Sequence, residues 1–201
     1  MSNEYFTLYN EIAEKYPEEA IVYATPQGQS REQLIKALIL PELKGLTLDI
    51  GCNDGHYAKY IKEYIGIDMA RAALHKFRRY KQYKYRVQGL AEMLPFSDCS
   101  FDSVFISEII EHVKNPLKVL HEIYRILKQN GQVLITTPAG NNSEQIVWPA
   151  ILTDYGVTKH PYLHSEFSKA QLTDMLTQVG FVDVAVHNPL AFQLIGVAYK
   201  K

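Results

Sequence analysis

The residues best suited to chemistry lie in a glycine-bearing turn, LDIGCNDGHYA, that spans Leu48 to Ala58. The short apolar run before the turn predicts a buried parallel strand, and ligands of open α/β sheets bind at the carboxyl ends of such strands. A glycine turn at this place exposes backbone N–H groups, which suit a carboxylate. The turn therefore predicts a binding site for a ligand with an anionic group.

The glycine spacing in this turn argues against a dinucleotide. A dinucleotide loop follows G-x-G-x-x-G, which from Gly51 would need glycines at positions 53 and 56, where the sequence has Asn53 and His56. The second glycine is Gly55 instead, which makes the turn wider. Between the two glycines, Asn53 is of the residue type that best tolerates a positive φ after glycine itself.

A further carboxylate follows the next predicted strand, Tyr64 to Asp68. Asp68 comes 17 residues after Gly51, at a strand end where an acidic side chain can accept hydrogen bonds from both hydroxyls of a ribose. The turn and Asp68 together predict a ligand that has a ribose and an amino-acid end.

The elements that must position these residues alternate between strand and helix, which indicates a doubly wound α/β fold. Strands are expected at 46–50, 64–68, 83–88, 101–107 and 132–137. Helices are expected at 2–15, from Ser30, at 57–63 and 70–80, from Asn115 to Asn130-Gly131, and from Ser168 to Gly180. Ser30 with Gln33, and Ser168 with Gln171, have the spacing of capping boxes. Two final strands, 182–187 and 192–199, follow each other and predict an antiparallel hairpin.

Composition limits the classes of function. A chain of 201 residues with 47% hydrophobic residues can bury one sizeable core, which favours a single domain. The net charge of −1 gives no general attraction to nucleic acid or membrane surfaces. The two cysteines, Cys52 and Cys99, are too few for a disulfide framework. The first twenty residues contain acidic side chains and no long apolar run, which predicts neither a signal peptide nor a membrane span, so we expect a cytoplasmic protein.

In five segments the sequence resembles the class I S-adenosylmethionine-dependent methyltransferases, and within them the small ubiquinone/menaquinone-biosynthesis-like branch, methyltransferase type 11. The segments are LDIGCNDG, YIGIDMA, AEMLPFSDCSFDSVFISEIIEHVKNP, GQVLITTP and HSEFSKAQLTDMLTQVGF. The third is the most specific, because LPF, SFD and EHV stand at the family's usual spacing. The resemblance implies a Rossmann-like doubly wound sheet of seven strands in the order 3-2-1-4-5-7-6, with the last strand antiparallel.

By position in these motifs, the resemblance also implies a site for S-adenosyl-L-methionine. The residues implied to bind the cofactor are Asp49, Gly51, Cys52, Asn53, Gly55, Asp68, Met69, Ala91, Glu92, Ser107 and Glu108. The turn would meet the methionine part, Asp68 the ribose, and Met69 the adenine. The sequence departs from the family at Asn53, where glycine is common, and at Leu90, where an acidic residue is common.

The resemblance implies methyl transfer to a small-molecule acceptor, with oxygen, nitrogen or carbon as the attacked atom. Within one domain, 1–201, we expect an N-terminal helical cap at 1–44, a cofactor-binding core at 45–138, a substrate lid at 139–166 and a C-terminal helix with a β-hairpin at 167–201. Because the cofactor supplies the reactivity, the protein mainly positions the acceptor and excludes water. The candidates for a catalytic base are His112 and the lid residues His160 and His164. No metal site is predicted.

Two other functions remain open at this point. The segment KFRRYKQYKYR, from Lys76 to Arg86, interleaves cations with aromatic residues and could bind nucleic acid, although a solvated helix face also explains it. This leaves an RNA or protein methyltransferase as an alternative. The departures at Asn53 and Leu90 leave a cofactor-binding regulatory subunit without catalysis of its own as another.

Overall fold

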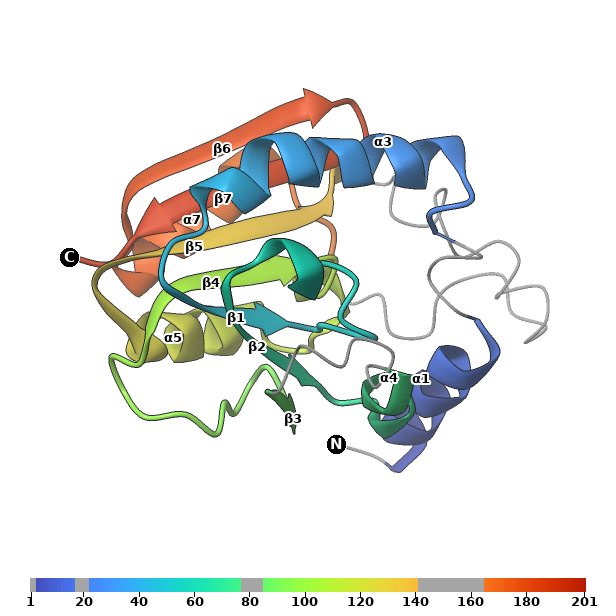
Figure 1. Cartoon of the computed structure of the whole chain (residues 1–201). Helices are drawn as coiled ribbons and strands as arrows, with labels where there is room; N and C mark the ends of the chain where they lie inside the picture. The colour runs from blue at the N-terminus through green and yellow to red at the C-terminus, as the bar shows by residue number, and fades with distance from the viewer. Residues whose placement is uncertain (1–2, 17–21, 77–84, 141–164) are drawn as a thin grey trace.

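The computed structural model describes residues 3–16, 22–76, 85–140 and 165–201. A seven-stranded sheet in the order β3-β2-β1-β4-β5-β7-β6 forms its centre (Figure 1). The strands from β3 to β5 pair in parallel, whereas β7 runs antiparallel to both β5 and β6. The predicted fold class, strand order and final antiparallel hairpin are therefore confirmed.

The elements have the following bounds. The strands are β1 (Leu46–Ile50), β2 (Glu63–Asp68), β3 (Arg86–Gln88), β4 (Phe101–Ser107), β5 (Leu127–Pro138), β6 (Val182–Leu190) and β7 (Gln193–Tyr199). The α-helices are α1 (Asn3–Lys15), α3 (Pro26–Leu34), α4 (Arg71–Lys76), α5 (Pro116–Ile126) and α7 (Lys169–Val179). Short helical turns occupy η1 (Ile35–Ile39), η2 (Leu40–Glu42), η3 (Ala58–Tyr60) and η5 (Ile110–His112).

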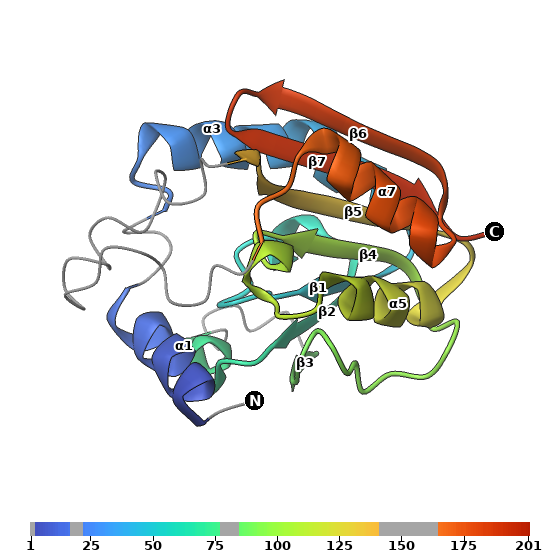
Figure 2. The same cartoon turned by 180° about the vertical axis from the view of Figure 1, so that it is seen from behind.

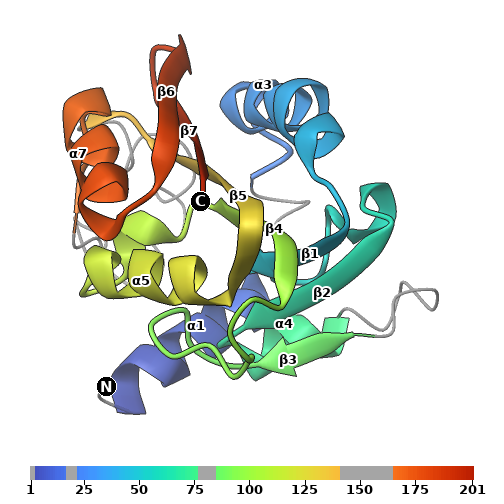
Figure 3. The same cartoon turned by 90° about the vertical axis from the view of Figure 1, so that its left-hand side faces the viewer.

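Helices cover both faces of the sheet. Figure 2 shows α5 and α7 on one face, and Figure 3 shows α3 on the opposite face. Side chains alternate between these layers along β4, because successive residues of a strand point to opposite faces. Val104 and Ile106 pack in the cluster that contains Leu120 of α5, whereas Phe105 packs in the cluster that contains Ile35. Full burial of each such side chain contributes about 1.5–3 kcal/mol, which fixes the sheet between its helices.

The helix α1 is fastened to α4, and Figure 1 shows the two side by side. The Asn10 Oδ1 atom accepts a hydrogen bond from the Ala72 backbone N–H at 3.0 Å. The Lys76 Nζ atom donates to the carbonyl oxygens of Ala13 and Glu14, at the C-terminal end of α1. A cation at this end of a helix is favourable because the last carbonyls are unpaired and partly negative.

The helix predicted to start at Ser30 starts earlier, so this prediction was wrong. The N-cap is Thr25, whose Oγ1 atom accepts a hydrogen bond from the Gly28 N–H at 3.0 Å, and Pro26 follows at the first helical position. Ser30 instead donates to the Pro26 carbonyl oxygen at 2.9 Å, inside the helix. A proline at the first helical position has its φ already set for a helix, so Thr25-Pro26 defines the start in place of the Ser30 spacing.

Other boundaries also differ from the prediction, among them β5, which begins at Leu127 and not at 132, and β6, which ends at Leu190 and not at 187. Only the short turn η3 forms where a helix was expected at 57–63, since β2 already begins at Glu63. The helix α5 ends at Ile126, and Asn130, with a φ of 62°, lies within β5 and does not end the helix. The described parts of the helix expected at 70–80 and the strand expected at 83–88 are α4 and β3, and residues 77–84 lie outside the described residues.

Other local predictions are confirmed. The strand β4 has the predicted bounds, and α7 begins with the predicted capping box of Ser168 and Gln171 and ends at Gly180, which has a φ of 107°. In the part of the chain that the structure describes, no helix combines the length and apolar character needed to cross a bilayer. The division into cap, core, lid and C-terminal unit stays a prediction, and most of the lid, 141–164, falls outside the described residues.

Candidate active site

The turn after β1 has the backbone conformation that its sequence predicts. Gly51 has a φ of 74°, and a Cβ atom there would lie 2.2 Å from the Ile109 Cδ1 atom, so only glycine fits. Asn53 has a φ of 47° and Gly55 a φ of 80°. Both are left-handed conformations, which glycine adopts freely and asparagine tolerates.

The N–H groups of this turn bond to the protein. Gly51 and Cys52 both donate to the Ile67 carbonyl oxygen, at 2.8 and 3.1 Å, and Gly55 donates to the Cys52 carbonyl oxygen at 2.8 Å. The expectation that the N–H groups of the turn would be open to a carboxylate is therefore wrong for these three groups. They fix the turn against the end of β2 and make it a rigid wall of the site.

Asp68 joins the turn to the end of β2. Its Oδ2 atom accepts from the Asn53 N–H at 2.9 Å, and its Oδ1 atom accepts from the Ala70 N–H at 2.7 Å. Burial raises the pKa of this carboxyl, while the hydrogen bonds from Ala70, Asn53 and Met69 lower it. A carboxylate has about four acceptor positions, so one remains for a hydroxyl beside these three hydrogen bonds.

Behind the turn, Asp49 belongs to a buried polar group. Tyr64 on β2 donates its hydroxyl to the Asp49 Oδ2 atom at 2.7 Å, and Asp49 is 3% exposed. Burial raises the pKa of the Cys52 thiol and of the Tyr64 phenol well above their ordinary values. Cys52 is therefore a neutral thiol that packs behind the turn, because a nucleophilic cysteine needs a lowered pKa.

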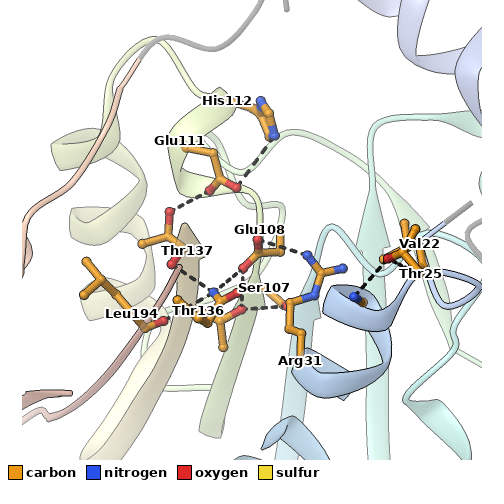
Figure 4. Close-up of polar contacts among 12 residues, drawn as sticks. Val22, Thr25, Arg31, Ser107, Glu108, Glu111, His112, Thr136, Thr137 and Leu194 are labelled. Atoms are coloured by element: carbon orange, nitrogen blue, oxygen red, sulfur yellow. Dashed lines mark hydrogen bonds and ion pairs between the residues drawn. The ribbon is translucent and has the colours of Figure 1, made fainter. Parts of the chain in front are cut away.

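Glu108 connects four elements at the end of β4 (Figure 4). Its Oε2 atom pairs with the Arg31 Nη1 atom of α3 at 3.1 Å. Its Oε1 atom accepts from Thr136 on β5 at 2.9 Å and from Gln193 on β7 at 2.8 Å. Ser107 lies 2.8 Å from Thr136, oxygen to oxygen. Glu108 has a φ of 56°, a strained conformation for a non-glycine residue that these contacts hold in place.

A second buried carboxyl lies next to this network. Glu111 is 2% exposed, and its Oε2 atom accepts from the Thr137 hydroxyl at 3.0 Å. Its Oε1 atom lies 3.7 Å from the His112 Nε2 atom. Burial raises the pKa of Glu111 well above 4.5, and the negative charge of Glu108 raises it further, while Thr137 and Arg31 lower it.

One cavity at the carboxyl edge of the sheet brings most of the predicted site together. Ten of the eleven predicted cofactor residues line it: Asp49, Gly51, Cys52, Asn53, Asp68, Met69, Ala91, Glu92, Ser107 and Glu108. Gly55 does not line it and serves the conformation of the turn. His112 lines the same cavity. His160 and His164 lie outside the described residues, so their role stays a prediction.

The cavity is also lined by residues that were not predicted from the sequence. One face of α1 and the residue that follows the helix contribute Tyr9, Ile12, Ala13 and Tyr16, whose spacing of three, four and seven residues is the signal that could have identified this face. From α3 comes Arg31, which is 6% exposed. His56 also lines the cavity, stacks on Tyr23 with ring centroids 4.1 Å apart, and has its Nε2 atom 2.8 Å from Glu32.

The comparisons with known proteins agree with this geometry. Residues 48–135 match the family model described as a methyltransferase domain. Over these residues the chain carries a methyltransferase domain. The matched residues run from the start of the glycine turn through β4 to β5, and so include the predicted cofactor residues. The recognition made from the five sequence segments is thereby confirmed.

Two relatives show the extent of the similarity. An uncharacterized methyltransferase of Bacillus subtilis, YcgJ, is 31% identical over 144 residues, which cover 67% of this chain and 54% of the relative. A probable S-adenosylmethionine-dependent methyltransferase of Mycobacterium tuberculosis is 29% identical over 163 residues, which cover 78% of this chain and 56% of the relative. The chain thus spans about half the length of the curated relatives it matches.

A solved structure confirms the fold. The S-adenosylmethionine-dependent methyltransferase of Thermotoga maritima, described as a possible histamine N-methyltransferase, has a TM-score of 0.71 and covers 98% of this chain and 100% of its own. At 22% identity this similarity shows the fold alone. S-adenosylmethionine is the cofactor named for both the mycobacterial and the Thermotoga protein, in agreement with the cofactor predicted here.

Proposed function

We propose that this chain transfers a methyl group from S-adenosylmethionine to a small-molecule acceptor. The observation that carries the proposal is the position of Asp68. Its carboxylate lies at the end of β2, is bonded to the turn at Asn53, and faces the same cavity as Met69. A carboxylate fixed beside a tight glycine turn fits a ribose that joins a methionine end to an adenine end.

The other proposed cofactor roles follow the order of the residues around the cavity. Gly51 and Asn53 form the wall for the methionine part, with Ser107 and Glu108 opposite on the end of β4. Met69 and the pair Ala91 and Glu92 form the adenine end. These roles are carried over from the family by position, and the common cavity supports them.

The charge of the cavity also supports this cofactor. Among its described residues, the carboxylates are Asp49, Asp68, Glu92 and Glu108, and the guanidinium is that of Arg31. S-adenosylmethionine carries two positive groups, the sulfonium and the ammonium, and one carboxylate. An acidic cavity with one buried cation therefore matches the charges of the cofactor.

The proposal of a small acceptor is supported by the wall that faces the sheet edge. The residues that α1 and its C-terminal end contribute to the cavity, from Tyr9 to Tyr16, are apolar or aromatic. Such a lining suits a small organic molecule, and the net charge of −1 offers no general attraction to a polyanion.

Calorimetry of the purified protein tests the proposal with two ligands, S-adenosylhomocysteine and NAD. We expect S-adenosylhomocysteine to bind and NAD to give no heat, because the glycines that a dinucleotide needs are absent at positions 53 and 56. Binding of NAD without any response to S-adenosylhomocysteine would reject the proposed function.

The variant Asp68→Asn sharpens this test. It retains one acceptor oxygen but loses the charge, so we expect S-adenosylhomocysteine binding to weaken by about tenfold to a hundredfold. Glu63→Gln is the matched control, because Glu63 is exposed at the other end of the same strand. Equal affinity of the folded Asp68→Asn protein and the control would remove Asp68 from the site.

A further inference from the structure

Apart from the proposed cofactor residues, the short turn η5 supplies a carboxyl and an imidazole that lie together. Figure 4 shows the carboxyl of Glu111 directed at the ring of His112, with 3.7 Å between the Glu111 Oε1 and His112 Nε2 atoms. His112 lines the cavity, whereas Glu111 is buried behind it. The sequence singles out His112 but not Glu111 as a partner for it.

The surroundings hold Glu111 in one orientation. Thr137 donates its hydroxyl to the Glu111 Oε2 atom at 3.0 Å, which leaves the Oε1 atom for His112. The charged groups that act on Glu111 are Glu108 and Arg31. Two titratable side chains of the described residues face His112: Glu111, and Tyr9 of α1, whose ring centroid lies 6.5 Å from the imidazole at an edge-on angle.

The chain on both sides of the predicted lid is anchored close to this pair. The Ser165 N–H donates to the backbone oxygen of Glu111 at 3.1 Å. The Gly140 N–H donates to the Phe167 oxygen at 3.0 Å, and Ala139 forms a parallel bridge with Phe167. Ser165 belongs to the segment predicted to contact the acceptor, and its bond to Glu111 ties the described end of that segment to the turn that carries the pair.

We propose that His112 takes a proton from the methyl acceptor, and that Glu111 is the positioning residue that orients the imidazole and stabilises its protonated form. This inference rests on the proposed function and adds a substrate class to it. The acceptor is an oxygen or nitrogen compound that carries a hydrogen on the attacking atom.

The proton balance is complete with these groups. The lone pair of the acceptor atom forms the new bond to the methyl carbon, the electron pair of the broken carbon–sulfur bond stays on sulfur, and the acceptor's proton passes to the His112 ring. No oxidant, reductant or metal ion enters the balance.

Electrostatics supports the division of roles between the two residues. Burial raises the pKa of Glu111, which means that its negative charge is poorly stabilised by its surroundings. A positive charge on the neighbouring imidazole compensates that carboxylate. The pair therefore gains more from protonation of His112 than a solvent-exposed pair would.

An NMR titration of the His112 imidazole, in protein saturated with S-adenosylhomocysteine, tests the inference without an acceptor. His112→Gln identifies the signal. Glu111→Gln keeps an oxygen for Thr137 but removes the charge, so we expect the titration midpoint of His112 to fall by about one pH unit or more. The exposed control Glu63→Gln should leave the midpoint unchanged. An unchanged midpoint in the folded Glu111→Gln protein overturns the inference, since a purely structural Glu111 would alter stability and not this midpoint.

A reciprocal measurement uses His112→Gln and so does not require that Glu111→Gln folds. In His112→Gln the neighbouring cation is lost, so the Glu111 carboxyl, followed by carbon-13 NMR, should titrate at a higher pH than in the unmodified protein. His121→Gln is the control, because His121 is exposed on α5. A Glu111 titration that is the same in all three proteins also overturns the inference.

A screen of hydroxyl and amine compounds with radiolabelled S-adenosylmethionine gives the kinetic test. For any compound methylated, we expect His112→Gln to lower kcat by about a hundredfold or more with the KM for the cofactor unchanged. Glu111→Gln should shift the pH profile of kcat, and Glu111→Asp should restore part of it. A kcat that His112→Gln leaves unchanged overturns the inference.

The two proposals fail in different ways. Absence of S-adenosylhomocysteine binding in calorimetry rejects the proposed function, whatever the titrations show. Binding of S-adenosylhomocysteine by a protein in which Glu111 and His112 titrate independently rejects only the role of this pair.

Discussion

Asn53 occupies a backbone conformation that few side chains tolerate. Its φ of 47° lies in the left-handed region, and its N–H is bonded to Asp68, so the turn cannot relax without losing that contact. The left-handed region costs an ordinary residue roughly 1–2 kcal/mol, and a β-branched residue more. Asparagine lowers this cost, which explains how the turn keeps its shape without the glycine that the family commonly has.

Two substitutions at this position should therefore have different effects on the free energy of unfolding. Asn53→Gly should leave the free energy of unfolding unchanged or slightly higher, because glycine adopts a positive φ without strain. Asn53→Val should lower it by about 1–3 kcal/mol, since a β-branched residue is strained there. Urea denaturation followed by circular dichroism measures both. Equal stability of the two variants would show that the φ at position 53 is not a constraint.

The residues that the sequence could predict are those set by local spacing. Asn53 and Asp68 follow strand ends at a fixed distance along the chain, and parallel strands place such ends side by side. Arg31 and Tyr9 reach the same cavity from N-terminal helices that no short motif connects to the sheet. The pairing of Glu111 with His112 depends on the direction of two side chains within one turn, which a sequence does not record.

At the level of elements, the start of α3 shows how two local signals compete. Thr25 and Pro26 form one N-terminal signal, and Ser30 with Gln33 forms another five residues later. The first is used because Thr25 accepts the Gly28 N–H and Pro26 lacks an N–H that would need a partner. Where a single signal was present, as at Asn115 of α5 and Ser168 of α7, the predicted start is confirmed.

This competition predicts different effects for two small substitutions. Thr25→Ala should lower the free energy of unfolding by about 1 kcal/mol, since it removes an N-cap. Ser30→Ala should change it by less than about 0.5 kcal/mol, because Ser30 is exposed within the helix. Denaturation with urea under one set of conditions compares them. A larger loss for Ser30→Ala would place the functional cap at Ser30 after all.

Strands were predicted more accurately than short helices for a physical reason. The strand β4 is buried along nearly its whole length, and its apolar residues, from Phe101 to Ile106, lie within the predicted bounds. The segment from Tyr57 to Glu63 also has buried residues, but β2 begins at its last position and leaves room for η3 alone. The periodicity of apolar residues does not show how many residues of a connection are available to form a helix.

Among the described residues, burial and ion pairing shift the pKa values of carboxyl groups in opposite directions. At the carboxyl edge of the sheet, burial raises the pKa of Glu111 and Asp68. On α5, the Arg125 guanidinium, which contacts both carboxylate oxygens at 2.8 and 2.9 Å, lowers the pKa of Glu122. Ionisation of Glu111 and Asp68 therefore lowers the stability of the protein, whereas ionisation of Glu122 raises it.

The two groups should give opposite trends of stability with pH. A group with a raised folded pKa binds its proton more tightly in the folded state, so the protein loses stability as the pH rises from 4.5, the ordinary value for Glu111, through the folded pKa. Glu111→Gln cannot ionise, so its free energy of unfolding should match that of the unmodified protein at low pH and exceed it increasingly above pH 4.5.

Glu122 has a lowered folded pKa, so its contribution to stability is present above pH 4.5 and is lost as the pH falls through the folded value. Glu122→Gln should therefore be less stable than the unmodified protein above pH 4.5, by a constant amount. Urea unfolding of the three proteins at intervals from pH 4 to pH 8 separates these trends, and a Glu111→Gln curve that runs parallel to the unmodified curve would show that Glu111 is as easily ionised as a carboxyl in water.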